Sequence, residues 1–158
     1  MAAINLKVPV EIIIKDGDKE ETIKVEIAEL TKKQSKELKE KMKEFEDISY
    51  RLDRLSSKLE SAKKKAEYAE KLQDYKKAMQ MQEKADEIEN ELEQILKKFK
   101  ELGGEEFFEK QAQKTFEKIV SGEGKARLKE IGEIKSFTYL MELLRQAKDE
   151  ELGKELKE

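Results

Sequence analysis

Residues 45–102 read FEDISYRLDRLSSKLESAKKKAEYAEKLQDYKKAMQMQEKADEIENELEQILKKFKEL, and two rows of apolar side chains in this stretch decide the fold. In each row the apolar residues are spaced by threes and fours, as on the buried face of a coiled-coil helix. The first row consists of Phe45, Ile48, Leu52, Leu55, Leu59, Ala62, Ala66 and Ala69. The second row consists of Ala78, Met81, Ala85, Ile88, Leu92, Ile95, Phe99 and Leu102.

One straight helix cannot bury both rows against a single partner. Between them the heptad positions carry polar side chains, namely Gln73, Lys76, Gln80 and Glu83. Across this gap the helical period turns the second row to roughly the opposite side of a continuous rod. The chain must therefore fold back for the two rows to be covered together.

Folding back between Gln73 and Asp74 brings the rows face to face, because they are mirror images about this point. Phe45 then lies opposite Leu102, and Asp74 is suited to cap the second helix. The absence of a glycine at the turn is the main argument for the alternative, an unbroken rod. We expect an antiparallel helical hairpin over residues 31–102 with this core: Phe45, Ile48, Leu52, Leu55, Leu59, Ile88, Leu92, Ile95, Phe99 and Leu102.

Residues 4–27 alternate between apolar and polar side chains, a pattern that predicts a β-hairpin within residues 1–30. A two-residue Asp16-Gly17 loop would place Val10 opposite Ile23, Val8 opposite Val25 and Leu6 opposite Ile27. A four-residue loop would keep the same apolar face. Pro9 favours an edge strand, because it cannot donate a ladder hydrogen bond. The apolar face needs a cover, since an isolated hairpin is marginally stable in water.

The helical period begins at Thr31, which together with Gln34 fits a capping box, and Gly103-Gly104 end it. We expect residues 103–158 to be helical and to pack on the β-hairpin or on the base of the coiled coil. A first short helix would include Val120, a second would break near Gly132 or Ser136, and residues 148–158 would fray. Five residues of the second are either core or a partner surface: Phe137, Tyr139, Leu140, Met141 and Leu144.

The composition argues against an enzyme. Charged residues make up 45% of the chain and apolar residues 37%, a balance that suits long exposed helices better than a thick core around a cleft. The chain has no Cys and no His, so disulfides, thiol chemistry and Cys/His metal sites are excluded. We therefore predict no catalytic residue, no cofactor and no metal, and we expect no membrane span and a cytoplasmic protein.

Three short motifs have ordinary structural interpretations. Gly122-Glu123-Gly124-Lys125 lacks the first glycine and the Ser/Thr of a phosphate-binding loop, and we interpret it as a helix–helix turn. The carboxylates at residues 16, 18 and 20 lack the length and helices of an EF-hand, and we interpret them as a hairpin turn. The only basic triplet, residues 63–65, is flanked by glutamates and reads as a solvated helix face.

The layout resembles one family. The segment LKVPVEIII (residues 6–14), a polar helical middle and FEKIVSGEGKARLKEIGEIKSFTYLMELL (residues 116–144) are similar to small phage tail-assembly chaperones and related prophage proteins. The likeness is one of layout over roughly half the chain, and it transfers no functional residue. It implies a non-enzymatic protein that binds an aggregation-prone tail protein during assembly.

The function expected from the sequence is a coiled-coil protein-interaction module with a chaperone-like role. Its partner would be another protein or a second copy in a homo-oligomer, not a small-molecule substrate. The first alternative is a self-assembling structural component of a larger complex. Nucleic-acid binding through the lysine-bearing hairpin ranks lowest, because charges of both signs are interleaved and the net charge is −3.

Overall fold

The computed structural model describes residues 2–157, which form two compact units. One unit, here called the sheet unit, contains the N-terminal residues up to Leu38 and the C-terminal residues from Glu106. The other, the hairpin unit, contains Lys39–Glu105. The N-terminal and C-terminal regions, which the sequence suggested as separate parts, therefore share one unit.

The sheet unit is built on an antiparallel hairpin of β1 (Lys7–Asp16) and β2 (Lys19–Ala28), and the short β3 (Val120–Ser121) pairs with β2. The strand order β1-β2-β3 confirms that Pro9 lies on an edge strand. Gly17 begins the two-residue loop with φ +63°, the conformation that type II′ turns require at this position.

This loop corrects the predicted pairing of the strands. The loop residues are Gly17-Asp18, not Asp16-Gly17, so Val10 pairs with Val25 and Val8 with Ile27. The shift of two residues leaves the same side chains on the apolar face, because side chains alternate with period two. Leu6 precedes β1 and is 79% exposed, so its predicted place opposite Ile27 is wrong.

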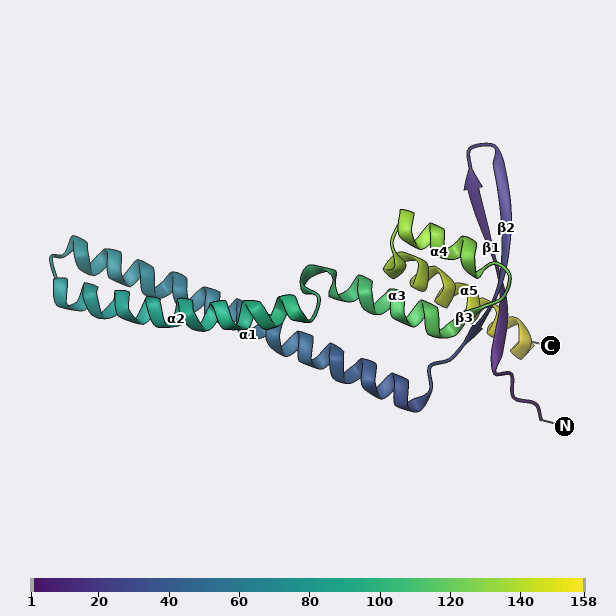
Figure 1. Ribbon diagram of the computed structural model, residues 1–158, viewed down its shortest axis with the longest axis horizontal. Coiled ribbons are helices and arrows are strands. Elements are labelled where there is room, and N and C mark those ends of the chain that lie inside the picture. Colours follow the sequence, from purple (N-terminus) through teal and green to yellow (C-terminus); the bar gives the residue numbers. More distant parts are fainter. Residues whose placement is uncertain (1, 158) are drawn as a thin grey trace. The chain divides into compact units, whose positions relative to one another are not determined.

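Helices α3 (Phe107–Ile119), α4 (Lys125–Ile134) and α5 (Phe137–Lys157) supply the cover that the hairpin needs (Figure 1). Helix α5 packs on β1, and α3 and α4 pack on α5. The buried core of this unit consists of Val8, Val10, Ile12, Ile23, Val25, Ile27, Phe116, Val120, Leu128, Phe137, Leu140 and Leu144. The C-terminal helices thus pack on the β-hairpin, one of the two alternatives left open by the sequence.

Two expectations for the C-terminal region are wrong. Val120 is not helical, because it leaves α3 and pairs with Ile27 in the sheet. Residues 148–157 do not fray: α5 continues to Lys157, Leu152 packs against the core, and Lys148 forms an ion pair with Glu29 at 3.5 Å. The break near Ser136 is confirmed, since α4 ends at Ile134 and the Ser136 hydroxyl accepts a hydrogen bond from the Tyr139 N–H.

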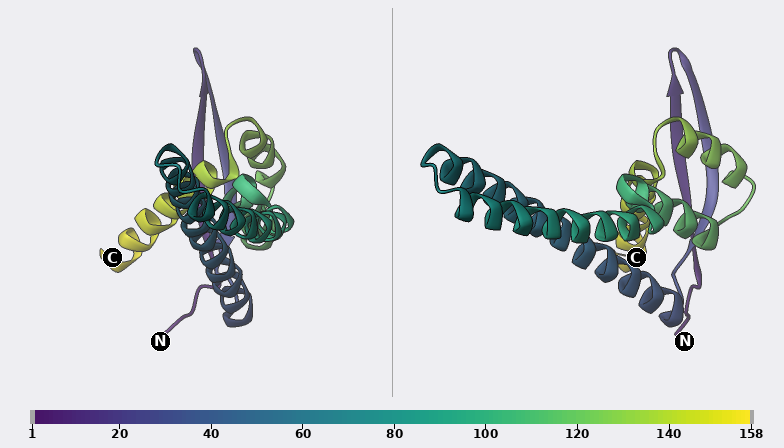
Figure 2. Two further views of the ribbon diagram at one scale, coloured as in Figure 1. Left: turned by 90° about the vertical axis from the view of Figure 1, so that its left-hand side faces the viewer. Right: turned by 60° about the vertical axis from the view of Figure 1, so that its left-hand side comes forward.

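The hairpin unit consists mainly of α2 (Tyr75–Glu101) and of the part of α1 (Lys32–Lys71) that begins at Lys39, and the two helices lie side by side and antiparallel (Figure 2). A short 3₁₀ helix, Gly104–Glu106, follows α2. The predicted capping box starts α1: the Gln34 N–H donates to the Thr31 hydroxyl at 3.1 Å, and the Thr31 N–H donates to Gln34 Oε1 at 3.0 Å. The helical hairpin of the prediction is confirmed, and the unbroken rod is excluded.

The predicted seam forms the core of the hairpin unit. Its most buried apolar residues include Ile48, Leu55, Ile88 and Ile95, while Leu52, Leu59, Leu92, Phe99 and Leu102 are half-buried against them. At the base the Phe45 ring stacks on Phe99 with ring centroids 5.4 Å apart. The mirror relation predicted Leu102 opposite Phe45. The observed stack is one helical turn away, within the range of neighbours that a side chain meets in an antiparallel seam.

Candidate functional site

The tip of the helical hairpin is a tight turn built without glycine. Gln73 has φ +60° and so occupies the left-handed position that glycine usually fills after a helix. The Gln73 N–H donates to the Glu70 carbonyl at 3.0 Å, and the Asp74 N–H donates to the Ala69 carbonyl at 2.9 Å. These two bonds form a Schellman motif, which satisfies the last carbonyls of α1.

Asp74 then starts the second helix, as predicted. Its side chain accepts a hydrogen bond from the Lys77 N–H at 3.2 Å. This bond is the usual N-cap interaction, which satisfies a backbone donor in the first turn of α2. The chain thus reverses direction over residues 72–74 and both helix ends are hydrogen-bonded.

Next to this turn, four large apolar side chains point into solvent. Tyr68 is 65% exposed and Leu72 62%, and on the second helix Tyr75 is 66% and Met79 67% exposed. The helical period places Tyr68 and Leu72 on the side of the hairpin that carries Lys65 and Lys77, and Tyr75 and Met79 on its opposite side, so the four side chains surround the tip. We call the surface that they form the tip patch. Four large apolar side chains exposed beside one turn offer contacts to a partner that covers the end of the hairpin.

Lysines are frequent in the sequence around the tip. Residues 58–77 contain seven lysines and four carboxylates. Lys64 forms an ion pair with Glu60 at 3.0 Å, whereas within residues 2–157 no carboxylate lies in ion-pair distance of Lys65 or Lys77. The positive charge of the tip is therefore only partly neutralised by the chain itself.

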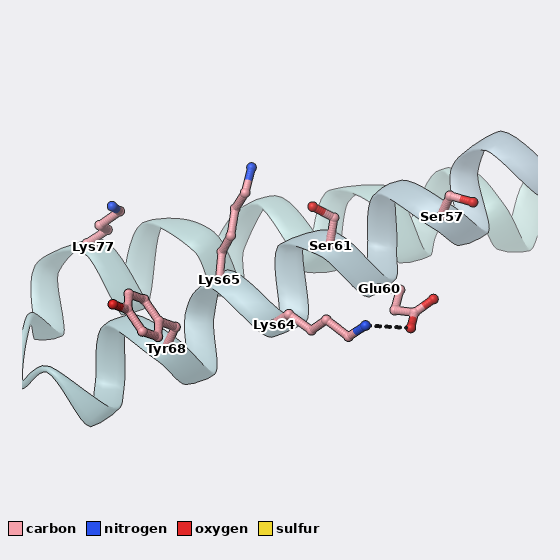
Figure 3. Close-up of a pocket in the computed structure, with 7 residues that line it drawn as sticks. All are labelled: Ser57, Glu60, Ser61, Lys64, Lys65, Tyr68 and Lys77. Carbon is pink, nitrogen blue, oxygen red and sulfur yellow. Dashed lines mark ion pairs between the residues drawn. The ribbon is translucent and has the colours of Figure 1, made fainter.

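A shallow hollow of about 500 Å³ lies between the two helices beside the tip patch (Figure 3). Tyr68 and Lys65 bound it on α1 and Lys77 bounds it on α2, whereas Lys64 turns towards Glu60. Further residues that line it are Ser57 and Ser61. The hollow thus presents two unpaired ammonium groups and three hydroxyl groups next to an exposed aromatic ring.

This arrangement suits binding rather than catalysis. General acid–base or nucleophilic chemistry needs a sheltered group with an altered pKa, and the residues that line the hollow are exposed. Within residues 2–157, the carboxyl groups with an altered pKa all lie in the sheet unit, and hydrogen bonds to neighbouring residues explain the change. For Glu117, hydrogen bonds from Lys129 and Lys125 outweigh burial and lower the pKa of the carboxyl group.

The partner surface proposed from the sequence lies elsewhere, and most of it is core. Phe137, Leu140 and Leu144 are at most 3% exposed and pack against the β-hairpin. Met141 is half-buried against the same core, and only Tyr139 is exposed. Phe137, Leu140 and Leu144 thus belong to the apolar face of α5 that covers the sheet.

The sequence already indicated the tip patch, but the prediction considered only the residues of the seam. Tyr68, Leu72, Tyr75 and Met79 obey the same mirror relation as the seam, but Leu72 and Tyr75 lie beyond its last alanines, and Tyr68 and Met79 lie beside them, off the seam. Apolar residues past the end of a buried seam, or beside it on the helix surface, have no partner helix to cover them. This is why they become surface at the turn.

No family model matches the sequence, and neither a curated protein nor a solved structure with significant similarity to the chain is found. Within residues 2–157, no helix combines the length and the apolar character that crossing a membrane requires. In the same part of the chain, no cluster of three carboxylate, histidine or cysteine side chains is arranged to hold a metal ion.

Proposed function

We propose that this chain is a non-enzymatic protein-interaction module that binds a partner protein with the tip of its helical hairpin. The observation that carries the proposal is the tip patch, where Tyr68, Leu72, Tyr75 and Met79 are all more than 60% exposed. Tyrosine is among the residues enriched in the centres of protein interfaces, and methionine adapts its shape to different partners.

The hairpin is well suited to present such a patch. Its own core is complete, and the turn is fixed by a Schellman motif and an N-cap, so the four side chains lie on a rigid support. A preorganised surface loses little conformational entropy on binding. A chaperone-like role, holding an apolar segment of another protein, fits this surface and the resemblance in layout to phage tail-assembly chaperones.

Site-specific photo-crosslinking in the producing cells tests the proposal. A photoreactive amino acid at Met79 should form an adduct with a particular partner protein, because Met79 lies in the tip patch. The matched control carries the same group at Lys97, which is also exposed on α2 but lies near its other end. The Met79 adduct should disappear when Tyr75 is changed to serine, because Tyr75 is exposed one turn away on the same side of α2.

Two results would contradict the proposal. Equal adducts from Met79 and Lys97 would mean that the tip has no special role. An adduct only between two copies of the chain would favour the self-assembling structural component instead.

A further inference from the structure

We propose that the hollow beside Tyr68 receives carboxylate side chains of the partner, so that the tip recognises an acidic segment with apolar residues. This inference rests on the proposed function and adds the chemistry of the partner. It follows from the charges in and around the hollow.

The hollow offers hydrogen-bond donors with unused positive charge. Lys65 and Lys77 have no ion-pair partner within residues 2–157, and the only carboxylate of the hollow, Glu60, is already paired with Lys64. The hydroxyl groups of Ser57, Ser61 and Tyr68 can each donate a further hydrogen bond. A carboxylate accepts several such bonds at once, and charge-assisted bonds are the stronger ones.

The tip patch defines the rest of the ligand. Tyr68 belongs to both the hollow and the patch, and Leu72 lies one turn further along the same side of α1, so a ligand whose carboxylate reaches Lys65 also meets these two apolar side chains. Alternation of acidic and apolar groups along one segment would satisfy both surfaces together. An acidic amphipathic helix or strand has this pattern.

Two features favour a polypeptide over a nucleic acid. Single-stranded nucleic acids stack their bases on several aromatic rings, but the hollow has one ring, Tyr68, and the exposed apolar residue beside it, Leu72, has none. In addition, four carboxylates among residues 58–77 offset more than half of the seven lysines. A phosphate backbone would meet repulsion from these carboxylates at several points, whereas one or two glutamates of a protein can be placed at Lys65 and Lys77.

Fluorescence anisotropy with the purified full chain tests the inference. The probe is a labelled helical peptide with glutamate on one face and leucine on the other. The test variant is the double change Lys65→Glu and Lys77→Glu, which reverses the charge of the hollow at exposed positions. The matched control, Lys97→Glu and Lys98→Glu, makes the same change in charge near the far end of α2. Circular dichroism verifies that both variants keep their helix content.

The wild-type chain should bind the peptide, and the test variant should bind it about tenfold or more weakly. The control variant should bind it as the wild-type chain does, and raising the salt concentration should weaken wild-type binding. Replacing the peptide's glutamates by glutamine should also weaken binding.

Several results would overturn the inference. The first is that the test variant binds the peptide as tightly as the wild-type chain does. The second is that the control variant loses as much affinity as the test variant. The third is that the glutamine peptide binds as tightly as the glutamate peptide. Tighter binding of a single-stranded oligothymidine would assign the hollow to nucleic acid, and a dimer of the chain that excludes the peptide would assign it to a second copy. If the peptide fails while the Met79 crosslink persists, only the acidic character of the partner is wrong. If both fail, the proposed function is wrong as well.

Discussion

At the scale of single residues, Glu109 joins two helices of the sheet unit. Its carboxylate, on α3, accepts hydrogen bonds from the N–H groups of Phe137 and Thr138 and from the Thr138 hydroxyl. These N–H groups belong to the first turn of α5, where a helix has no internal acceptors for them. Glu109 therefore caps α5 from a distant part of the chain.

The pH dependence of stability should reveal this cap. Burial alone would raise the pKa of Glu109, but the hydrogen bonds from Phe137 and Thr138 lower it below the ordinary 4.5. Because the folded-state pKa is the lower one, the carboxylate stabilises the fold fully above that ordinary value and loses its contribution as the pH falls through the folded pKa. Glu109→Gln should cost about 1 kcal/mol in urea unfolding at neutral pH. The difference from wild type should shrink in acid.

Glu133→Gln provides the control, because Glu133 is exposed on α4 and makes no hydrogen bond or ion pair within residues 2–157. It should leave the free energy of unfolding unchanged at both pH values. A Glu109→Gln difference that stays constant into acid would show that the charge of Glu109 does not support the cap.

Gly124 is required by a close approach to β2. A Cβ atom at Gly124 would lie 2.3 Å from Cγ2 of Ile23 and 2.6 Å from the Lys24 carbonyl oxygen. Gly124→Ala should therefore destabilise the chain by about 1–3 kcal/mol, because backbone must move. Gly153→Ala is the matched substitution: its Cβ would meet nothing within 4 Å, and alanine favours the helix by up to about 1 kcal/mol. A melting temperature of Gly124→Ala above that of Gly153→Ala would contradict this explanation.

At the scale of elements, the turn of the helical hairpin stores strain at Gln73. Its φ of +60° places a side chain in the left-handed region, which costs about 1 kcal/mol relative to glycine. Gln73→Gly should therefore raise the free energy of unfolding of the hairpin by roughly this amount. Lys71→Gly, inside the last turn of α1, should lower it by a similar amount, because glycine weakens a helix interior. Urea unfolding followed by circular dichroism measures both, and a destabilising Gln73→Gly would contradict the Schellman assignment.

The elements differ in how well the sequence predicts them. The seam repeats over many residues, so its reflection located the turn at residues 73 and 74 even without glycine. In the β-hairpin, the alternation of side chains determines which of them share a face. It does not distinguish two registers that differ by two residues, and only the position of Gly17 in the loop decides between them. The strand β3 has two residues, too few for any periodicity, and its pairing depends on contact with a distant strand.

At the scale of the whole molecule, the sheet unit joins the two ends of the chain, one of two arrangements that the local patterns left open. The apolar face of α5 could be interpreted from sequence as core or as partner surface, because both produce the same helical spacing. Only the presence of β1 against α5 shows that Phe137, Leu140 and Leu144 are core. The tip patch was missed because its residues lie beside the last alanines of the seam or beyond them, where the facing helix does not cover them.

The two units have separate cores with no residue in common, so damage to one should leave the other folded. Leu55 is 8% exposed within the hairpin core, and Leu55→Asp would bury an unpaired charge at a cost of more than about 3 kcal/mol. Hydrogen exchange measured by mass spectrometry should then show loss of amide protection along α2, while β1 and β2 keep theirs. Ser56→Asp introduces the same charge at the adjacent exposed position and should leave both regions protected. If amide protection persists in α2 of the Leu55→Asp variant, the assignment of Leu55 to the core is wrong. If protection is lost in both units, the two units unfold together.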